Sequence, residues 1–177
     1  MKTYIVLLRG INVSGKNKLP MAALRELLND LGFQKVQTYI QSGNIVLDTD
    51  ITKAVLCSKI KEEILSRFGY EVPVMARTLD EWENAIANNP YPIANHKILA
   101  FAFLSELPKK QTIEVKGTKD DVYTIIEDVV YIYCPSGMGS TKLTNNLFEK
   151  QLEVHATSRN YRTSITLLEM AKNNKGS

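Results

Sequence analysis

The succession of apolar patterns in the first half of the chain constrains its fold more than any other feature. A buried strand is expected at Tyr4–Leu8, and a helical pattern starts after Pro20. A hairpin is predicted over Val36–Leu47, an amphipathic helix over Ile51–Phe68 and a strand over Val72–Ala76. The resulting order, β-α-β-β-α-β, is that of a ferredoxin-like α+β fold.

A second set of strands follows a break in regular structure. A helix is predicted over Leu79–Ala87, and Asn88–Pro92 is expected to be a linker. Alternating apolar runs then predict strands at Ile98–Leu104, Val122–Ile126 and Val129–Tyr133. These strands repeat the order of the first half, which indicates a structural duplication.

Helical patterns complete the second half. A weak one follows Pro108, another starts near Thr141, and a closing helix is predicted over Ser164–Lys172. No clear fourth strand follows Val154, and residues 173–177 are expected to form a disordered tail. We therefore predict two ferredoxin-like (split βαβ) subdomains, the second without a clear last strand and ending in an extra helix. The expected ranges are 1–78 for the first subdomain, 79–96 for the helix and linker, and 97–177 for the second subdomain.

Composition favours an ordinary globular protein, with 44% hydrophobic and 23% charged residues and a net charge of +3. No apolar run reaches the ~20 residues that span a bilayer, and the N-terminus lacks a signal peptide pattern. We therefore expect a cytoplasmic protein with no membrane partner.

Cys57 and Cys134 lie on apolar patterns and are interpreted as core residues. No metal and no cofactor are expected, because His96 and His155 lack the spacing of metal ligands.

A glycine-rich segment after the first strand approaches the phosphate-loop pattern G-x-x-x-x-G-K-[ST]. Residues 10–17 fit it except at the last position, where Asn17 replaces the hydroxyl that would bind magnesium. Lys18-Leu19-Pro20 also delays the helix that should face the phosphates. An NTPase loop is therefore not predicted. Two alternatives remain: a looser anion site, or a flexible connection whose glycines serve only backbone geometry.

Other polar segments allow a ligand role and a structural role. Around Gly43 the hairpin tip favours a tight turn over ligand contacts, because Gly and Asn tolerate positive φ. Residues 135–142 form a loop rich in glycine and hydroxyl side chains. Helix capping is the leading interpretation of these residues, and an anion-binding site is the second. The two arginines of 157–163 suit forked contacts with an anion, or an internal ion pair with a carboxylate.

Aromatic and acidic residues in the second half have ordinary explanations. Phe101 with Phe103, and Tyr131 with Tyr133, alternate as aromatics do on RNA-binding sheets. The basic signature of that module is missing, so we interpret them as core residues. The acidic pair Asp120-Asp121 lies in a polar context and is interpreted as a solvated face.

Three strings occur in an order that resembles the family called domain of unknown function 1697: residues 7–13, 38–46 and 156–161. The resemblance implies a cytoplasmic bacterial protein of two ferredoxin-like subdomains, with no activity to carry over. Ser14 stands where the family tends to have glycine, and Tyr161 where tryptophan is usual. The family's motif positions here are Arg9, Gly10, Asn12, Lys16, Gln41, Ser42, Gly43, Asn44, Ser140, Lys142, Thr157, Arg159 and Asn160.

The function prediction is binding of a phosphate-bearing or other anionic ligand (a nucleotide, a sugar phosphate or nucleic acid) in a basic polar cleft between the two halves. It assumes that the loop 9–16 and the segment 157–162 meet at their seam. The predicted ligand residues are Arg9, Asn12, Lys16, Gln41, Ser42, Asn44, Ser140, Lys142, Thr157, Arg159 and Asn160. Two alternatives remain: an enzyme that stabilises an anionic transition state with the same groups, and a purely structural or protein-interaction role. A small anionic ligand is the better supported partner and nucleic acid the weaker one, and the oligomeric state does not follow from the sequence.

Overall fold

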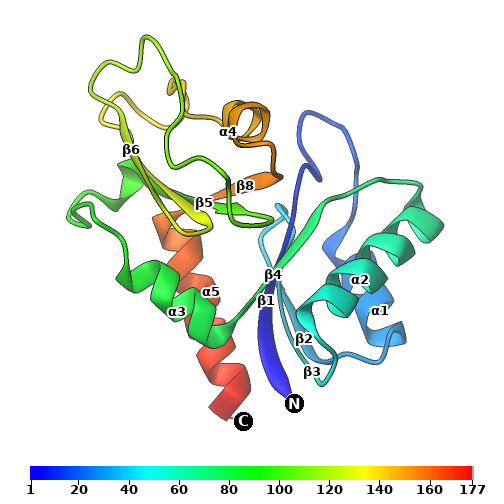
Figure 1. Cartoon of the computed structure of the whole chain (residues 1–177). Helices are drawn as coiled ribbons and strands as arrows, with labels where there is room; N and C mark the ends of the chain where they lie inside the picture. The colour runs from blue at the N-terminus through cyan, green and yellow to red at the C-terminus, as the bar shows by residue number, and fades with distance from the viewer. Residues whose placement is uncertain (177) are drawn as a thin grey trace. The chain divides into compact units, whose positions relative to one another are not determined.

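The computed structural model describes residues 1–176, which form two compact units (Figure 1). Unit 1 comprises Met1–Glu83 with Thr166–Ser177, and unit 2 comprises Asn84–Ile165. Each unit contains a four-stranded antiparallel sheet with helices, which confirms the predicted α+β class. Whether 1–78 and 97–177 fold as independent domains stays a prediction. No helix in the described part of the chain is both long enough and apolar enough to cross a membrane.

The sheet of unit 1 has the order β2-β3-β1-β4 and is antiparallel throughout. Its central strands are β1 (Lys2–Leu8) and β3 (Asn44–Thr49), and its edges are β2 (Gln34–Tyr39) and β4 (Val74–Thr78). Most residues of both central strands are buried, as their apolar sequences predict. The antiparallel pairing of β2 with β3 confirms the predicted hairpin, whose turn lies at residues 40–43.

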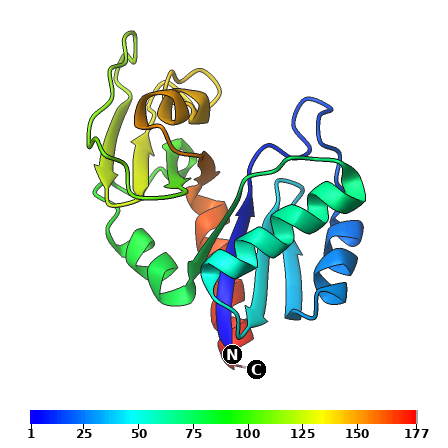
Figure 2. The same cartoon turned by 45° about the vertical axis from the view of Figure 1, so that its right-hand side comes forward.

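Two helices cover one face of this sheet (Figure 2). The helix α1 (Met21–Asp30) starts directly after Pro20, and α2 (Lys53–Phe68) ends at Gly69, whose φ of 74° is left-handed. Both boundaries follow from local chemistry, because proline suits a helix start and glycine a left-handed C-terminal position. The apolar faces of the helices and sheet share one core, which includes Tyr4, Val6, Leu8, Ile11, Leu24, Leu28, Ile45, Leu47, Leu56, Ile60 and Ile64.

The end of the chain is ordered as far as it is described, contrary to the predicted disordered tail. The helix α5 (Tyr161–Gly176) continues past Lys172, and Asn174 is 3% exposed. The Nδ2 of Asn174 donates to the carbonyl of Lys35 at 3.0 Å, and its carbonyl accepts from Lys35 Nζ at 2.9 Å. Gln37 Nε2 donates to Asn174 Oδ1. The prediction is wrong for 173–176 because these polar contacts with β2 hold the helix end; Ser177 lies outside the described residues.

The sheet of unit 2 has the order β6-β7-β5-β8. Its strands are β5 (Leu99–Leu104), β6 (Val122–Ile126), β7 (Val129–Tyr133) and β8 (Ala156–Asn160). The last strand corrects the sequence analysis, which found no clear fourth strand. The β8 sequence is mostly polar, but its pairing with β5 holds it in the sheet despite its weak β pattern.

The helices of unit 2 differ from the prediction in two places. Residues 105–121 contain no helix, so the helical segment expected after Pro108 is absent. The helix α4 (Asn145–Leu152) starts four residues after Thr141, where the Thr144 hydroxyl caps it by accepting from Leu147 N. The short η1 (His96–Ile98) precedes β5, and α3 (Leu79–Ala87) has the predicted bounds. One core lies between α4 and the sheet: Ala102, Leu104, Ile113, Ile125, Val130, Ile132, Cys134, Leu143, Phe148, Leu152 and Ala156.

The aromatic residues on the other face of this sheet are mainly buried. Phe101, Phe103 and Tyr131 are each at most 1% exposed, and the rings of Phe101 and Tyr131 meet edge to face with centroids 5.1 Å apart. The Tyr131 hydroxyl donates to the carbonyl of Ala85 at 2.6 Å, and burial raises its pKa. The core interpretation is confirmed for these three, whereas Tyr133 is half-buried.

Replacing Asn174 with alanine should lower the free energy of unfolding by about 1–3 kcal/mol, because the hydrogen bonds that its buried side chain makes to Lys35 and Gln37 of β2 are lost. Urea unfolding followed by circular dichroism measures the change. The matched control is Lys175→Ala, which changes an exposed position on the same helix end. Equal stabilities of the two variants would contradict the role given to Asn174.

Candidate functional site

The predicted ligand residues are divided between the two units. Unit 1 carries Arg9, Asn12, Lys16, Gln41, Ser42 and Asn44, and unit 2 carries Ser140, Lys142, Thr157, Arg159 and Asn160.

The loop after β1 is a small hairpin, residues 12–17, that we call the tip hairpin. Lys16 N donates to the Val13 carbonyl at 2.9 Å, and Asn12 N donates to the Asn17 carbonyl at 3.1 Å. The two residues at its turn, Ser14 and Gly15, have φ values of 50° and 74°. Positive φ at both central positions is the signature of a type I′ turn, which suits a two-residue hairpin. The segment therefore has defined structure, unlike the flexible connection considered from sequence.

Two asparagine side chains attach the tip hairpin to the neighbouring loops of unit 1. Asn12 Nδ2 donates to the Leu19 carbonyl at 2.9 Å and to the Gln41 carbonyl at 2.8 Å, while its Oδ1 accepts from Leu19 N at 2.8 Å. Asn17 Nδ2 donates to the Gly10 carbonyl at 3.0 Å. Asn12, which the sequence placed among the ligand residues, thus shapes the loop. Asn17, which the sequence analysis treated only as a mismatch, does the same.

The turn between β2 and β3 lies against the end of β1, a proximity that the sequence left open (Figure 2). Leu8 N donates to the Gly43 carbonyl at 2.9 Å. A Cβ on Gly43 would lie 2.6 Å from Leu8 Cβ and 2.9 Å from Ile11 Cδ1, and its φ is 82°. Only glycine satisfies both the close approach and the left-handed backbone. The two family strings that meet here are therefore held together by main-chain and core contacts.

The polar residues of this turn divide into internal and exposed groups. Asn44 is fully buried, and its Nδ2 donates to the Tyr39 carbonyl at 3.0 Å and to Ser42 Oγ at 2.8 Å. These bonds satisfy the turn itself, as the turn interpretation of this segment expects. Gln41 is exposed, and its carbonyl is the group that accepts from Asn12.

The exposed part of the tip hairpin is rich in hydrogen-bond donors. The side chains of Lys16 and Lys18 are exposed, and the N–H groups of Ser14 and Gly15 have no acceptor among residues 1–176. Arg9 is half-buried at the base of the loop. No aspartate or glutamate occurs before Glu26 or within 37–47. This end of unit 1 therefore offers positive charge and free amides without a nearby carboxylate from either loop.

Ile40 is a residue of this end that the sequence analysis missed. Its φ is 49°, and its side chain is 51% exposed. A β-branched residue with positive φ is a genuine outlier. Neither β propensity nor hydrophobic patterning can reveal it, because both treat isoleucine as an ordinary strand residue.

In unit 2, a buried carboxylate organises the loop after β7. Asp121 is 5% exposed and accepts from Ser136 N at 3.0 Å and Ser136 Oγ at 2.5 Å. Burial raises the pKa of this carboxyl, but hydrogen bonds from Ser136 and Thr141 outweigh it and bring the pKa below its usual value. The solvated-face interpretation is wrong for Asp121, because the loop folds over it.

The predicted residues of this loop are engaged locally or exposed. Ser140 Oγ donates to the Ser136 carbonyl at 2.8 Å, and Lys142 is exposed. The Cys134 thiol lies 3.3 Å from Thr141 Oγ1, and burial raises its pKa. A raised pKa favours the neutral thiol, so Cys134 has the character of a core residue.

The predicted residues of β8 also make internal contacts. Arg159 is 8% exposed, and its Nη1 donates to Thr157 Oγ1 at 2.7 Å and to the Ser158 carbonyl at 2.9 Å. Asn160 Oδ1 accepts from Thr163 N at 2.8 Å, which caps the first turn of α5. Their predicted ligand roles stay predictions. Within 1–176 no group of three His, Cys, Asp or Glu side chains is placed to hold a metal ion.

A family model matches the part of the chain that contains two of the three strings noted in the sequence, residues 7–13 and 38–46. The family model described as "Protein of unknown function (DUF1697)" matches residues 1–131. The chain belongs to this family. The DUF1697 chain is also similar to a solved structure, the conserved bacterial protein SP0830 from Streptococcus pneumoniae, with 27% sequence identity and a TM-score of 0.71. The match covers 96% of this chain and 98% of that one. No curated protein matches.

In this DUF1697 protein, Gly43→Ala should lower the free energy of unfolding by about 2–4 kcal/mol, since it adds a clash to a left-handed backbone. Chemical denaturation measures the loss. Gly15→Ala is the control, because its φ is also positive but no atom lies within 4 Å of its Cβ position. An equal loss in both variants would show that backbone strain alone, and not the approach to β1, requires glycine at position 43.

Proposed function

We propose that this protein binds a phosphate-bearing anionic ligand at the tip hairpin of unit 1. The observation that carries the proposal is that Lys16 on the ordered hairpin and Lys18 directly after it are exposed, close in the chain to the N–H groups of Ser14 and Gly15, which have no acceptor among residues 1–176. Main-chain N–H groups in turn conformations form concave donor sites for anions, and lysine adds a point charge.

The anchoring of the loop supports this proposal energetically. A loop that must become ordered on binding loses affinity to the entropy of ordering. Here the hydrogen bonds of Asn12 and Asn17 fix the hairpin before any ligand arrives. The donors are then available in one geometry, which favours a rigid acceptor such as a phosphate group.

Neighbouring polar residues extend the proposed contact surface. Gln41 is exposed and joined to the hairpin through the Asn12 contact, so its amide can donate to the same ligand. Arg9 at the base of the loop adds a guanidinium suited to forked contacts with phosphate oxygens. The proposal rests on unit 1 alone.

We also infer that both units are versions of one ferredoxin-like arrangement, related by duplication. The two sheets support this inference because their strand orders correspond: the second, third, first and fourth strands of each half follow one another across the sheet. Unit 2 lacks a helix between its first two strands, where residues 105–121 form a long connection.

Thermal-shift measurements with inorganic phosphate, pyrophosphate, ATP and glucose 6-phosphate test the binding proposal. At about one hundred times the dissociation constant, a ligand should add about 2.7 kcal/mol, which raises the Tm by about 5–10 °C in a protein of this size. Lys16→Ala should remove most of this rise, because it deletes a charge at the site.

Lys61→Ala is the matched control, since Lys61 is exposed on α2 within the same unit and outside the tip hairpin. Its Tm should rise with phosphate ligands as in the unchanged protein. No rise with any of the four ligands would contradict the proposal, and so would a rise that Lys16→Ala leaves intact.

A further inference from the structure

We infer that the phosphate-bearing ligand is a single-stranded nucleic acid, held by the tip hairpin and by Ile40 of the β2–β3 turn. The inference rests on the proposed function and names the class of its ligand. It is motivated by two exposed aliphatic side chains on the same two loops as the proposed phosphate-binding groups.

The first of these, Ile40, is held in a backbone conformation that isoleucine disfavours. Its φ of 49° places a β-branched side chain in the left-handed region, and half of its surface is exposed. Asparagine or glycine would occupy this position with less strain. Burial in a core does not offset the strain, because the side chain faces solvent. Strained residues cluster at functional positions, and a half-exposed side chain recovers only part of the cost through burial.

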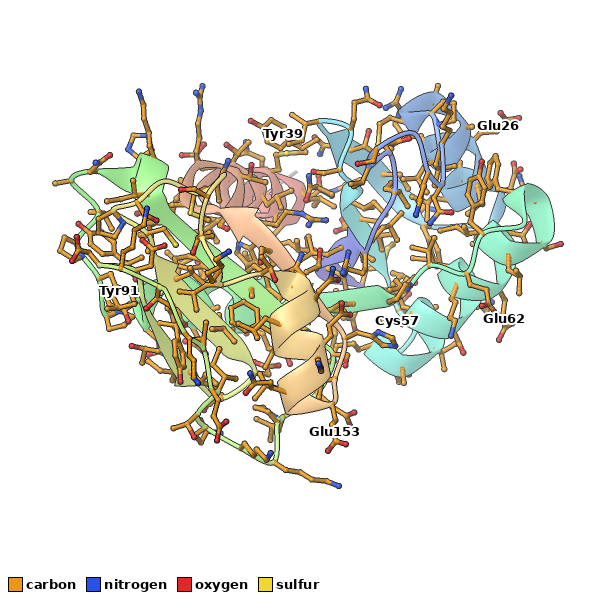
Figure 3. All side chains as sticks on the ribbon, turned by 90° about the horizontal axis from the view of Figure 1, so that it is seen from above. Glu26, Tyr39, Cys57, Glu62, Tyr91 and Glu153 are labelled. Atoms are coloured by element: carbon orange, nitrogen blue, oxygen red, sulfur yellow. The ribbon has the colours of Figure 1, made fainter. Side chains whose placement is uncertain are left out.

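The second aliphatic residue belongs to the tip hairpin. Val13 is 56% exposed and directly precedes the Ser14-Gly15 turn. The 2.8 Å bond from Asn12 Nδ2 to the Gln41 carbonyl joins the neighbours of Val13 and Ile40, so both side chains belong to the same end of unit 1. Tyr39, labelled in Figure 3, directly precedes Ile40 and is half-buried.

Cations, N–H donors and exposed aliphatic side chains occur together on these two loops, and this combination indicates the class of ligand. An inorganic phosphate or a sugar phosphate needs cations and N–H donors, but exposed valine and isoleucine add nothing to its binding. A single strand offers phosphates to Lys16 and Lys18 together with unstacked bases, whose faces pack on apolar and aromatic side chains. A duplex stacks its bases internally and presents mainly phosphates.

A membrane surface fits the same patch less well. Electrostatic binding to anionic lipid uses clusters of about 4–8 basic residues, and interfacial insertion uses leucine, phenylalanine or tryptophan. The loop carries three basic residues, Arg9, Lys16 and Lys18, and its exposed apolar side chains are valine and isoleucine. Bases are therefore the better match for its small apolar surface.

Fluorescence anisotropy with labelled oligothymidine and oligouridine, measured over a series of KCl concentrations, tests the inference. Binding should weaken with salt, and Lys16→Gln and Lys18→Gln should each reduce the slope of log K against log salt by about 0.7, the value for one phosphate contact on a single strand. Lys61→Gln on α2 should leave the slope unchanged.

The variant Ile40→Asn distinguishes an effect on oligonucleotide binding from an effect on stability. Relief of the strained backbone should raise the Tm by about 2–4 °C, while loss of the apolar contact should weaken oligonucleotide binding about tenfold. The control is Leu65→Gln, which removes an aliphatic side chain of α2 that is 44% exposed. It should bind as the unchanged protein does. Unaltered binding by Ile40→Asn would overturn the role of Ile40.

Parallel measurements with pyrophosphate, with a duplex of equal length and with phosphatidylserine vesicles distinguish the other ligands. Stabilisation by pyrophosphate without oligonucleotide binding would overturn the inference and leave the proposed function standing. Tighter binding to the duplex, or binding only to vesicles, would overturn the inference. Absence of binding to every probe would overturn both.

Discussion

The side-chain amide of Asn12 is the interaction on which the candidate site depends. Its three hydrogen bonds fix the base of the tip hairpin to Leu19 and its side to Gln41. Gly43 allows the β2–β3 turn to lie close enough for that contact, because any Cβ there would meet Leu8 and Ile11. Without this attachment, the segment that carries Lys16 and Lys18 would be less constrained, and each contact with an anion would carry a larger entropic cost.

Backbone strain is concentrated at the same end of unit 1. Asn12, Ser14, Asn17 and Ile40 all have positive φ. The asparagines tolerate this conformation and repay it with side-chain hydrogen bonds. Ile40 has no comparable compensation from its apolar side chain, which is exposed. The contrast distinguishes residues that shape the loop from Ile40, for which we propose a contact with the ligand.

Much of the fold could be predicted from the sequence, because the helices and central strands have strong apolar periodicity. The bounds of α3, β6 and β7 agree with the prediction. The missed elements are stabilised by tertiary contacts: β8 is polar and depends on pairing with β5, and the end of α5 depends on Asn174. The polar motifs at the candidate site were recognisable, but their division into internal and exposed groups was not. Hydrogen-bond partners far apart in sequence, such as Asn12 and Gln41, determine that division.

Two-dimensional ¹H–¹⁵N NMR of the full chain, titrated with oligothymidine, identifies the residues that contact a single strand. We expect the shifted amides to be those of the tip hairpin and of the β2–β3 turn, with Ser14, Gly15 and Ile40 among them, and α2 amides such as that of Lys61 to stay in place. Shifts that cluster elsewhere in the protein while the tip hairpin remains unperturbed would contradict this expectation.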